Sequence, residues 1–450
     1  MRDLAFVGFL LALLAMGFRR PFLFVLAYAY VDIVSPQHLS YFLINSVPLS
    51  MIVAGLAFAG FAIADAKTGA RFSVRQGLML LLLGYAAFTT ANADFPVEAG
   101  EKWDWVWKVL AWSLFLPFVL RTRLRIEAYL LFMVLCASSI VIVGGIKTAL
   151  SGGGYGVLNL MVSNNSGLYE SSTISTVAIA IVPLILWLSR FGTVFPRDWR
   201  VRLFAAALIF ACLLIPVGTE ARTGLVCIAV LAMLMLREVK RRFLYAGMIA
   251  LATVAVIPFL PDSFSSRMET ISGHREDASA STRIAVWKWT WDYAQGNPLG
   301  GGFGAYRQNK LQVRTVATRE AGSVEVVSEQ VMFDKARAYH SSYFEMLGEQ
   351  GFPGLFLWLL IHGIGLIRME TLRRRYRAEA GDKAWISPLA TALQGAQIIY
   401  LVGSLFVGLA FQPFVWMLLS VQIAFDLWVT RRARQAAKPP RPFRAAPAAA

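Results

Sequence analysis

The sequence predicts an all-α polytopic membrane protein, and three observations point to that class. The chain of 450 residues is 57% hydrophobic and only 16% charged, whereas a soluble globular protein carries about 25% charged residues. Apolar runs close to the length of a membrane-spanning helix recur along most of the chain. The net charge of +16 comes from Lys and Arg in short connections between these runs, as the positive-inside bias requires, so it does not indicate nucleic-acid binding.

We expect about 12–13 transmembrane helices, because a spanning helix needs about 20 mostly apolar residues and the first two runs are short enough to be half-depth helices. The expected segments are 4–18, 21–34, 47–64, 76–91, 106–120, 126–150, 171–189, 203–217, 223–236, 243–260, 354–367, 389–411 and 413–429.

Basic connections occur at every second crossing, which predicts that they face the cytoplasm. They are 67–75, 121–125, 190–202, 237–242, 368–377 and the tail from Arg431. The intervening connections are then outside: an acidic one at 92–105, a second at 151–170, a tight turn at 218–222 and one long polar loop. Strict alternation places the N-terminus outside, unless the first two segments cross once together or re-enter.

The chain divides into an N-terminal transmembrane bundle (1–260), a large outer loop (261–351), C-terminal transmembrane helices (352–430) and a disordered basic tail (431–450). The three cysteines, Cys136, Cys212 and Cys227, all lie in apolar runs. The outer loop therefore has no disulfide and no thiolate metal cluster. We find no HExxH, Walker or GxSxG motif and no DxD-type metal pair in that loop, so no metal ligand is predicted.

The first motif of the outer loop is an amphipathic, Trp-rich helix. Ser281 and Thr282 are good N-caps, and Asn297-Pro298 predicts the helix end. Such a helix outside the membrane is typical of one that lies on the bilayer surface. Arg283 falls in its expected first turn, where a guanidinium and free backbone N–H groups suit a phosphate. The four glycines in 300–304 allow either a flexible hinge or a close approach of the backbone to a ligand.

The second motif closes the loop. Ser342 and Glu345 are spaced as a capping box, which predicts a helix start, and Gly351 followed by Pro353 predicts a stop. His340 then lies just before a helix N-terminus, where the dipole disfavours imidazolium and keeps the ring able to accept a proton. A capping or packed histidine is the alternative. The segment 308–335 between the motifs is polar and mixed in charge, and fits an acceptor-facing insertion or a mobile lid.

A third group comes from the outer turn at 218–224. An arginine at the head of a membrane helix, here Arg222, is costly unless it is paired or used. It either forms a salt bridge with Glu220 or reaches the interface, or it supplies a second cation for a diphosphate.

These three motifs, in this order and on one side, resemble the O-antigen ligase/polymerase superfamily of bacterial inner-membrane glycan transferases. The turn ARTG at 221–224 is similar to the family's Ser-Arg-Thr/Ser-Gly turn, with Ala for Ser. The segment 283–302 resembles its "R…W…P-l-G-x-G" pattern. The segment 340–354 resembles its "H-N-x-x-L…G-x-x-G" pattern, with Ser for Asn after the histidine. The likeness covers about 203–367, and the N-terminal third further resembles the probable O-glycosylation ligases that accompany exosortase systems.

The resemblance implies transfer of a glycan from an undecaprenyl diphosphate carrier to an acceptor hydroxyl on the periplasmic face of the bacterial inner membrane, with no metal or other cofactor. Arg222 and Arg283 are implied to clamp the diphosphate, and His340 to act as general base, with inversion at the anomeric carbon. The implied substrate-binding residues are Trp287, Gly300, Gly302 and Tyr343. The implied partners are the lipid-linked donor, a glycan, lipid or protein acceptor, and membrane lipids.

Two other functions compete with a ligase. One is a polymerase, whose acceptor is another lipid-linked repeat unit, and the sequence does not separate the two. The other is a secondary transporter, which often shows charged residues at mid-membrane and paired broken helices. We see neither feature in the sequence. A non-catalytic assembly protein is a further possibility, and it would tolerate loss of Arg283 and His340.

Overall fold

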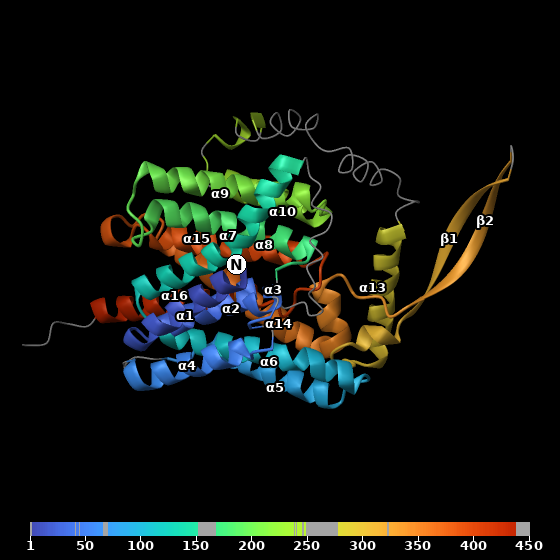
Figure 1. Ribbon diagram of the computed structural model, residues 1–450, viewed down its shortest axis with the longest axis horizontal. Coiled ribbons are helices and arrows are strands. Elements are labelled where there is room, and N and C mark those ends of the chain that lie inside the picture. The colour runs from blue at the N-terminus through green and yellow to red at the C-terminus, as the bar shows by residue number, and fades with distance from the viewer. Residues whose placement is uncertain are drawn as a thin grey trace, which may run out of the picture.

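The protein is a bundle of long helices with a two-stranded hairpin projecting from one end (Figure 1). The computed structural model describes residues 2–40, 42–44, 46–65, 71–151, 168–237, 239, 241–244, 247–248, 278–321 and 324–437. The helices are α1 (Arg2–Arg19), α2 (Phe22–Val34), α3 (Pro36–Leu39), α4 (Leu49–Ala64), α5 (Val74–Ala91), α6 (Pro96–Val119), α7 (Arg123–Ser151), α8 (Ser171–Phe191), α9 (Trp199–Gly218), α10 (Arg222–Arg237), α13 (Ala278–Gly296), α14 (Ser342–Arg375), α15 (Ile386–Gly403) and α16 (Pro413–Ala436). Short 3₁₀ helices occupy Ala305–Gln308 (η2) and Gly381–Lys383 (η3), and the strands are β1 (Lys310–Ala321) and β2 (Val324–Lys335).

Every expected apolar segment has a helix at its position except 243–260, which lies almost entirely outside the described residues. Within the described residues, seven segments are long and apolar enough to cross a membrane, namely Val74–Ala91, Arg123–Leu150, Ser171–Phe191, Trp199–Gly218, Ser342–Arg375, Gly381–Gly403 and Pro413–Ala436. Helices α2 and α4 are apolar but shorter. The all-α polytopic class is therefore confirmed. The expected count of about 12–13 spans exceeds these seven, because α2, α4 and α10 are short while α1 and α6 carry charged residues.

Three expected boundaries are wrong. The acidic connection at 92–105 is helical from Pro96, since a proline suits the first turn of a helix and the charged face of α6 continues the span. The helix at 389–411 ends at Gly403, and the chain that follows packs against α14. The tail expected to be disordered from Arg431 is helical as far as Ala436, and residues 438–450 lie outside the described residues.

Helix α14 crosses the expected border between the outer loop and the C-terminal helices. It is one continuous element from Ser342 to Arg375, interrupted only by a kink at Gly351, whose φ of 63° and ψ of −169° are not helical. The expected stop is therefore a break in direction. Glycine can adopt this conformation at little cost, and Pro353 two residues later restarts the helix.

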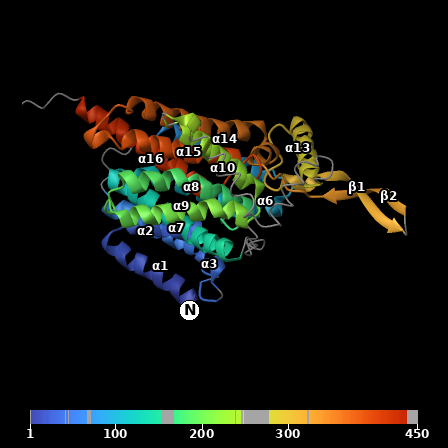
Figure 2. The same cartoon turned by 90° about the horizontal axis from the view of Figure 1, so that it is seen from above.

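The hairpin was missed in the sequence. Strands β1 and β2 pair antiparallel from Lys310 with Lys335 to Ala321 with Val324, and they extend away from the bundle (Figures 1 and 2). Asn309 fastens the base, because its side chain donates to the Arg337 carbonyl at 2.7 Å and accepts from the Arg337 N–H at 2.9 Å. Residues 310–321 and 324–335 thus form a two-stranded ribbon.

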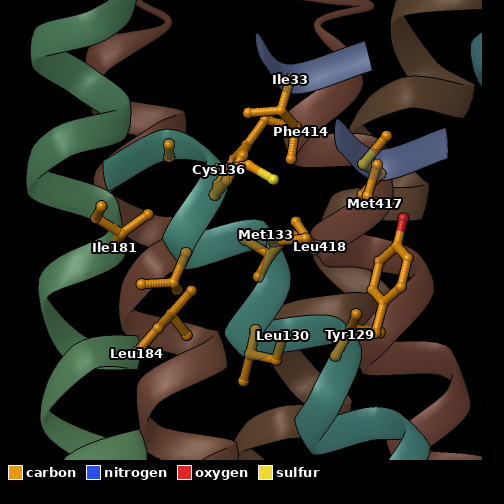
Figure 3. Close-up of a cluster of buried hydrophobic side chains, with 14 of the residues drawn as sticks. Ile33, Tyr129, Leu130, Met133, Cys136, Ile181, Leu184, Phe414, Met417 and Leu418 are labelled. Carbon is orange, nitrogen blue, oxygen red and sulfur yellow. The ribbon is translucent and has the colours of Figure 1, made fainter. Parts of the chain in front are cut away.

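The core of the bundle is built by helices that are far apart in sequence (Figure 3). Tyr129, Leu130 and Met133 of α7 lie against α8 and α16 side chains and are fully buried. All three cysteines are unpaired and buried, among them Cys136. This core fixes the ends of α8, α10, α14 and α15, on which the candidate site is built.

Candidate functional site

The candidate site lies at the end of the bundle from which the hairpin projects. There α13 crosses the ends of the bundle helices (Figure 1) and packs against the first turns of α14 and against β1. The buried face of α13 carries Val286, Thr290 and Ala294, while Ile284 and Trp291 are exposed. Two apolar side chains of the helix expected to lie on the bilayer are therefore uncovered.

Helix α13 begins at Ala278, so Arg283 lies in its second turn and not in the first. Ser281 and Thr282 are inside the helix, because the preceding Ala-Ser-Ala sequence also favours helix. The expected position of Arg283 in the first turn, beside free N–H groups, is therefore wrong. The expected helix end is confirmed, since the helix ends at Gly296, directly before Asn297-Pro298.

Arg283 acts electrostatically on His340. Partial desolvation lowers the pKa of His340, the Arg283 charge lowers it further, and the Glu170 carboxylate opposes them. His340 precedes α14 by two residues, as expected, and its φ of 47° is in the left-handed region, which non-glycine residues adopt at a cost. Neutral His340 was expected from the helix dipole; its surroundings favour the same state chiefly through desolvation and Arg283.

Trp287 holds the backbone that presents His340. Its indole N–H donates to the Tyr339 carbonyl at 2.8 Å. Its ring stacks on Phe344 with centroids 5.1 Å apart and planes at 6°. Trp287 therefore joins α13 to both sides of His340, and it is placed to position that residue.

Arg222 lies at the first residue of α10, beside the start of α8. The turn before it is held by a bond of 2.8 Å between the hydroxyls of Thr219 and Ser175. Glu170 caps the N-terminus of α8, where its carboxylate accepts from the Thr173 N–H at 2.6 Å. Glu170 and Ser175 are five residues apart, roughly 7 Å along a helix. The turn that carries Arg222 thus adjoins the first turns of α8, and Glu170 at the start of α8 also acts electrostatically on His340.

The glycine run is packed against the kink of α14. Gly300, with φ of 88°, is so close that a Cβ there would meet the Gly351 nitrogen at 2.5 Å, and the reverse contact to the Gly300 nitrogen is also 2.5 Å. Gly302 donates its N–H to the Glu349 carbonyl at 2.9 Å. The close approach that Gly300 permits is therefore to the backbone of α14, whereas the one that Gly302 permits is to Thr89 and Ala93 at the end of α5.

A buried ion cluster beneath the glycine run was missed in the sequence. Lys102 Nζ lies 2.6 Å from both Glu345 Oε1 and Glu349 Oε2. The two carboxylate side chains are 8% and 2% exposed. Glu349 also accepts from the Gly304 N–H at 3.1 Å, and Glu345 from the Ala410 N–H at 3.2 Å. The cluster ties α6, α14, the glycine run and the segment after α15 together.

The expected capping box is absent. Ser341 is the N-cap of α14 and makes no side-chain cap bond. Ser342 instead donates its hydroxyl to the Val407 carbonyl at 2.9 Å, and Glu345 is held by Lys102. Tyr343 donates to the Leu401 carbonyl at 3.0 Å. These side chains anchor the start of α14 to the end of α15 because both ends are buried together.

Two tyrosines at the site were also missed. Tyr293 of α13 donates to the Asp94 carboxylate between α5 and α6, and burial followed by that carboxylate raises the pKa of Tyr293. The Tyr339 hydroxyl is buried and has no hydrogen-bond partner among the described residues. No sequence spacing links these residues to their neighbours, since Tyr293 and Asp94 are 199 positions apart.

The described residues contain no group of three or more His, Cys, Asp or Glu side chains that could hold a metal ion. The site they form is a histidine and arginines at the mouth of a helical bundle, with a buried ion cluster beneath. These features define a multi-pass membrane protein with a polar site at one end of its spans.

The comparisons with known families agree with this class. Residues 205–359 match the family described as O-Antigen ligase, and residues 1–193 match a family of unknown function, DUF5935. The first match contains Arg222, Arg283 and His340. No curated protein matches the chain. The O-Antigen ligase match supports the superfamily that the motifs resemble, and with the membrane-length helices it supports a membrane glycan ligase-type function.

Proposed function

We propose that this protein transfers a glycan from an undecaprenyl diphosphate carrier to an acceptor hydroxyl on the periplasmic face of a bacterial inner membrane. The observation that carries the proposal is the placement of His340 directly before α14, where Trp287 holds the adjoining backbone and where desolvation and the Arg283 charge lower the pKa of the imidazole. A neutral imidazole can accept a proton at neutral pH. The O-Antigen ligase match over the same residues supports the reaction class.

The transfer follows from these side chains. The acceptor hydroxyl attacks the anomeric carbon, and its proton passes to His340. The bond between that carbon and the diphosphate oxygen breaks, and the lipid diphosphate leaves with the bonding electrons. Arg283 and Arg222 stabilise the charge that develops on it. Attack from the side opposite the leaving group inverts the anomeric centre.

The surrounding residues position these groups. Trp287 bonds to Tyr339 and so holds the backbone of His340. Gly300 lets the glycine run close on the kink of α14, and the Lys102 cluster holds both from beneath. Tyr343 fixes the first turn of α14 to α15. A base within 1 Å of its productive place is worth orders of magnitude in rate, so such fixing is what the reaction needs.

The experiment compares His340→Ala and Arg283→Gln with Lys288→Gln, an exposed cation on the same helix as Arg283. Each full-length variant is expressed in a strain that lacks the native gene, and its membrane abundance is measured. Lipid-linked glycan and glycosylated product are then quantified by mass spectrometry. We expect the first two variants to accumulate donor and form at least about 100-fold less product, the scale of general-base catalysis, while Lys288→Gln behaves as wild type.

Normal product from His340→Ala and Arg283→Gln at normal abundance would overturn the proposal. The product also identifies the acceptor. One transferred glycan on a lipid or protein indicates a ligase, whereas a ladder of lipid-linked repeats indicates a polymerase. The narrower resemblance to exosortase-associated O-glycosylation ligases makes protein hydroxyls the first acceptors to test.

A further inference from the structure

A cavity lined by charged and aromatic side chains lies at the other end of the bundle. Its volume is about 840 Å³, and it is lined by the C-terminal ends of α14 and α16, the start of α15 and Arg123 at the start of α7. Helix α14 begins beside His340 and ends at Arg375 in this cavity. Its 34 residues rise roughly 50 Å, which matches a bilayer with its headgroups. The cavity is therefore separate from the transfer site.

The cavity carries an excess of positive charge. Four basic side chains line it: Arg123, Arg375, Lys383 and Arg432. Two carboxylates, Glu379 and Asp382, line it as well, and Glu379 lies 3.6 Å from the Lys383 ammonium. The lining thus has two more cations than anions. A cavity of this size and charge suits an anionic ligand as large as a small organic molecule.

Aromatic rings form one wall of the cavity. Trp385 and Trp428 lie with ring centroids 5.2 Å apart, and the Arg123 guanidinium sits 4.4 Å over the Trp385 ring. Arg123 donates through one terminal nitrogen to the Phe191 carbonyl at 3.2 Å. Its Nε–H is enclosed and has no hydrogen-bond partner among the described residues. That enclosed N–H does not face the cavity, but the rest of the guanidinium, beside two tryptophans, is suited to a phosphate at the membrane interface.

We propose that this cavity binds the phosphate-bearing headgroup of an anionic phospholipid. Its position at the ends of three membrane-length elements puts it at headgroup depth. Its lining also includes Ile386 and Val429. These apolar side chains suit the glycerol and first methylenes of a lipid, whereas they offer a free phosphate no favourable contact. Basic pockets between transmembrane helices bind such headgroups for these reasons.

The C-terminal tail is a poor alternative occupant. Ala437 is the last described residue and lines the cavity. The 13 residues after it include Lys438, Arg441 and Arg444 and no acidic residue. A cationic tail is repelled by a lining with excess positive charge, whereas an anionic headgroup is attracted.

The test uses a double variant with a matched control. Arg375→Gln with Arg432→Gln removes two cations from the cavity, and Arg377→Gln with Arg434→Gln removes two exposed cations from the same helix ends that do not line it. Full-length proteins are delipidated in a neutral detergent. Thermal unfolding is followed with added phosphatidylglycerol, phosphatidylcholine or inorganic phosphate, and lipid adducts are counted by native mass spectrometry.

We expect phosphatidylglycerol to raise the melting temperature of wild type and of the control pair, with phosphatidylcholine and inorganic phosphate without effect. The cavity pair should bind phosphatidylglycerol at least about tenfold more weakly, as expected for loss of charge-assisted bonds, with an unchanged melting temperature in the absence of lipid. A chain lacking 438–450 should keep the full response.

Three results would overturn the proposal: an equal response in the cavity and control pairs, a response to inorganic phosphate as large as that to the lipid, or binding that appears only after the tail is removed. The first places the lipid elsewhere, the second makes the ligand a soluble anion, and the third makes the tail the occupant. Glycan transfer by the cavity pair should stay normal, which separates this proposal from the proposed function.

Discussion

Replacing Lys102 by methionine tests whether the buried ion cluster holds the site together. The substitution keeps the apolar stem and removes the charge that joins Glu345 and Glu349. Because Lys102 Nζ lies 2.6 Å from an oxygen of each carboxylate, those oxygens are no further apart than twice that distance. Two like charges about 5 Å apart repel by roughly 3 kcal/mol at an effective dielectric constant of 20.

We therefore expect Lys102→Met to lower the free energy of unfolding substantially. Leaving buried charges unpaired costs about 3–5 kcal/mol of the free energy of unfolding, and the repulsion alone accounts for the lower figure. The assay is reversible unfolding of the purified protein in mixed detergent micelles, followed by tryptophan fluorescence. Glycan transfer should fall as well, since Glu349 holds the Gly304 N–H beneath the site.

Lys108→Met is the matched control on the same helix. Lys108 pairs at 2.9 Å with Asp104, whose side chain is 72% exposed, and such surface pairs contribute at most about 0.5 kcal/mol. Adding Glu345→Gln and Glu349→Gln to Lys102→Met should recover most of the lost stability, because the amide oxygens still accept the backbone N–H bonds. The reasoning is refuted if Lys102→Met costs no more than Lys108→Met, or if the amides recover nothing.

Three further outcomes are expected. Trp287→Phe keeps the stacked ring but loses the hydrogen bond to the Tyr339 carbonyl. Glycan transfer should slow by about three- to tenfold, with an unchanged melting temperature. A normal rate of product formation would contradict the positioning role of Trp287. Gly351→Ala should destabilise by about 2 kcal/mol or more, because of its positive φ and close backbone contact. Gly363→Ala on the same helix meets nothing within 4 Å and should be neutral or stabilising in the same denaturation assay. Desolvation lowers the pKa of His340 from 6.5, so the ring is neutral above that pH. Transfer activity should be constant above pH 6.5 and fall only below it. The free energy of unfolding should fall in the same acid range, because the unfolded chain binds the proton more readily than the folded one. A loss of activity centred above pH 6.5 would disprove this assignment.

Most of the bundle helices were predictable because they are apolar runs with clear ends. The end of α13 before Asn297-Pro298 and the start of α14 at Ser342 follow from local chemistry, and both are confirmed. The start of α13 was misjudged, since Ser281 is an equally good residue inside a helix preceded by alanines. Caps depend on one or two local bonds, and tertiary contacts redirected those of Ser342.

The hairpin and the ion cluster needed more than apolar periodicity. Strands β1 and β2 form a ribbon that extends from the bundle (Figure 1), and their sequence contains no apolar run of membrane length. Their β-branched content and the Gly322-Ser323 dipeptide between them were the usable signal. No local signal exists for Lys102, whose partner Glu345 is 243 positions away.

The contact between Gly300 and Gly351 also constrains how this sequence can change over generations. Each position lacks room for a Cβ because the other's backbone occupies it, so a methyl group at either site separates the loop from α14. A substitution at Gly300 does not make one at Gly351 tolerable, nor the reverse. No single substitution at either position is therefore neutral. Related proteins that keep this contact between the glycine run and α14 should therefore keep both glycines. A protein that has lost one of them needs further substitutions that restore both the contact and the position of His340.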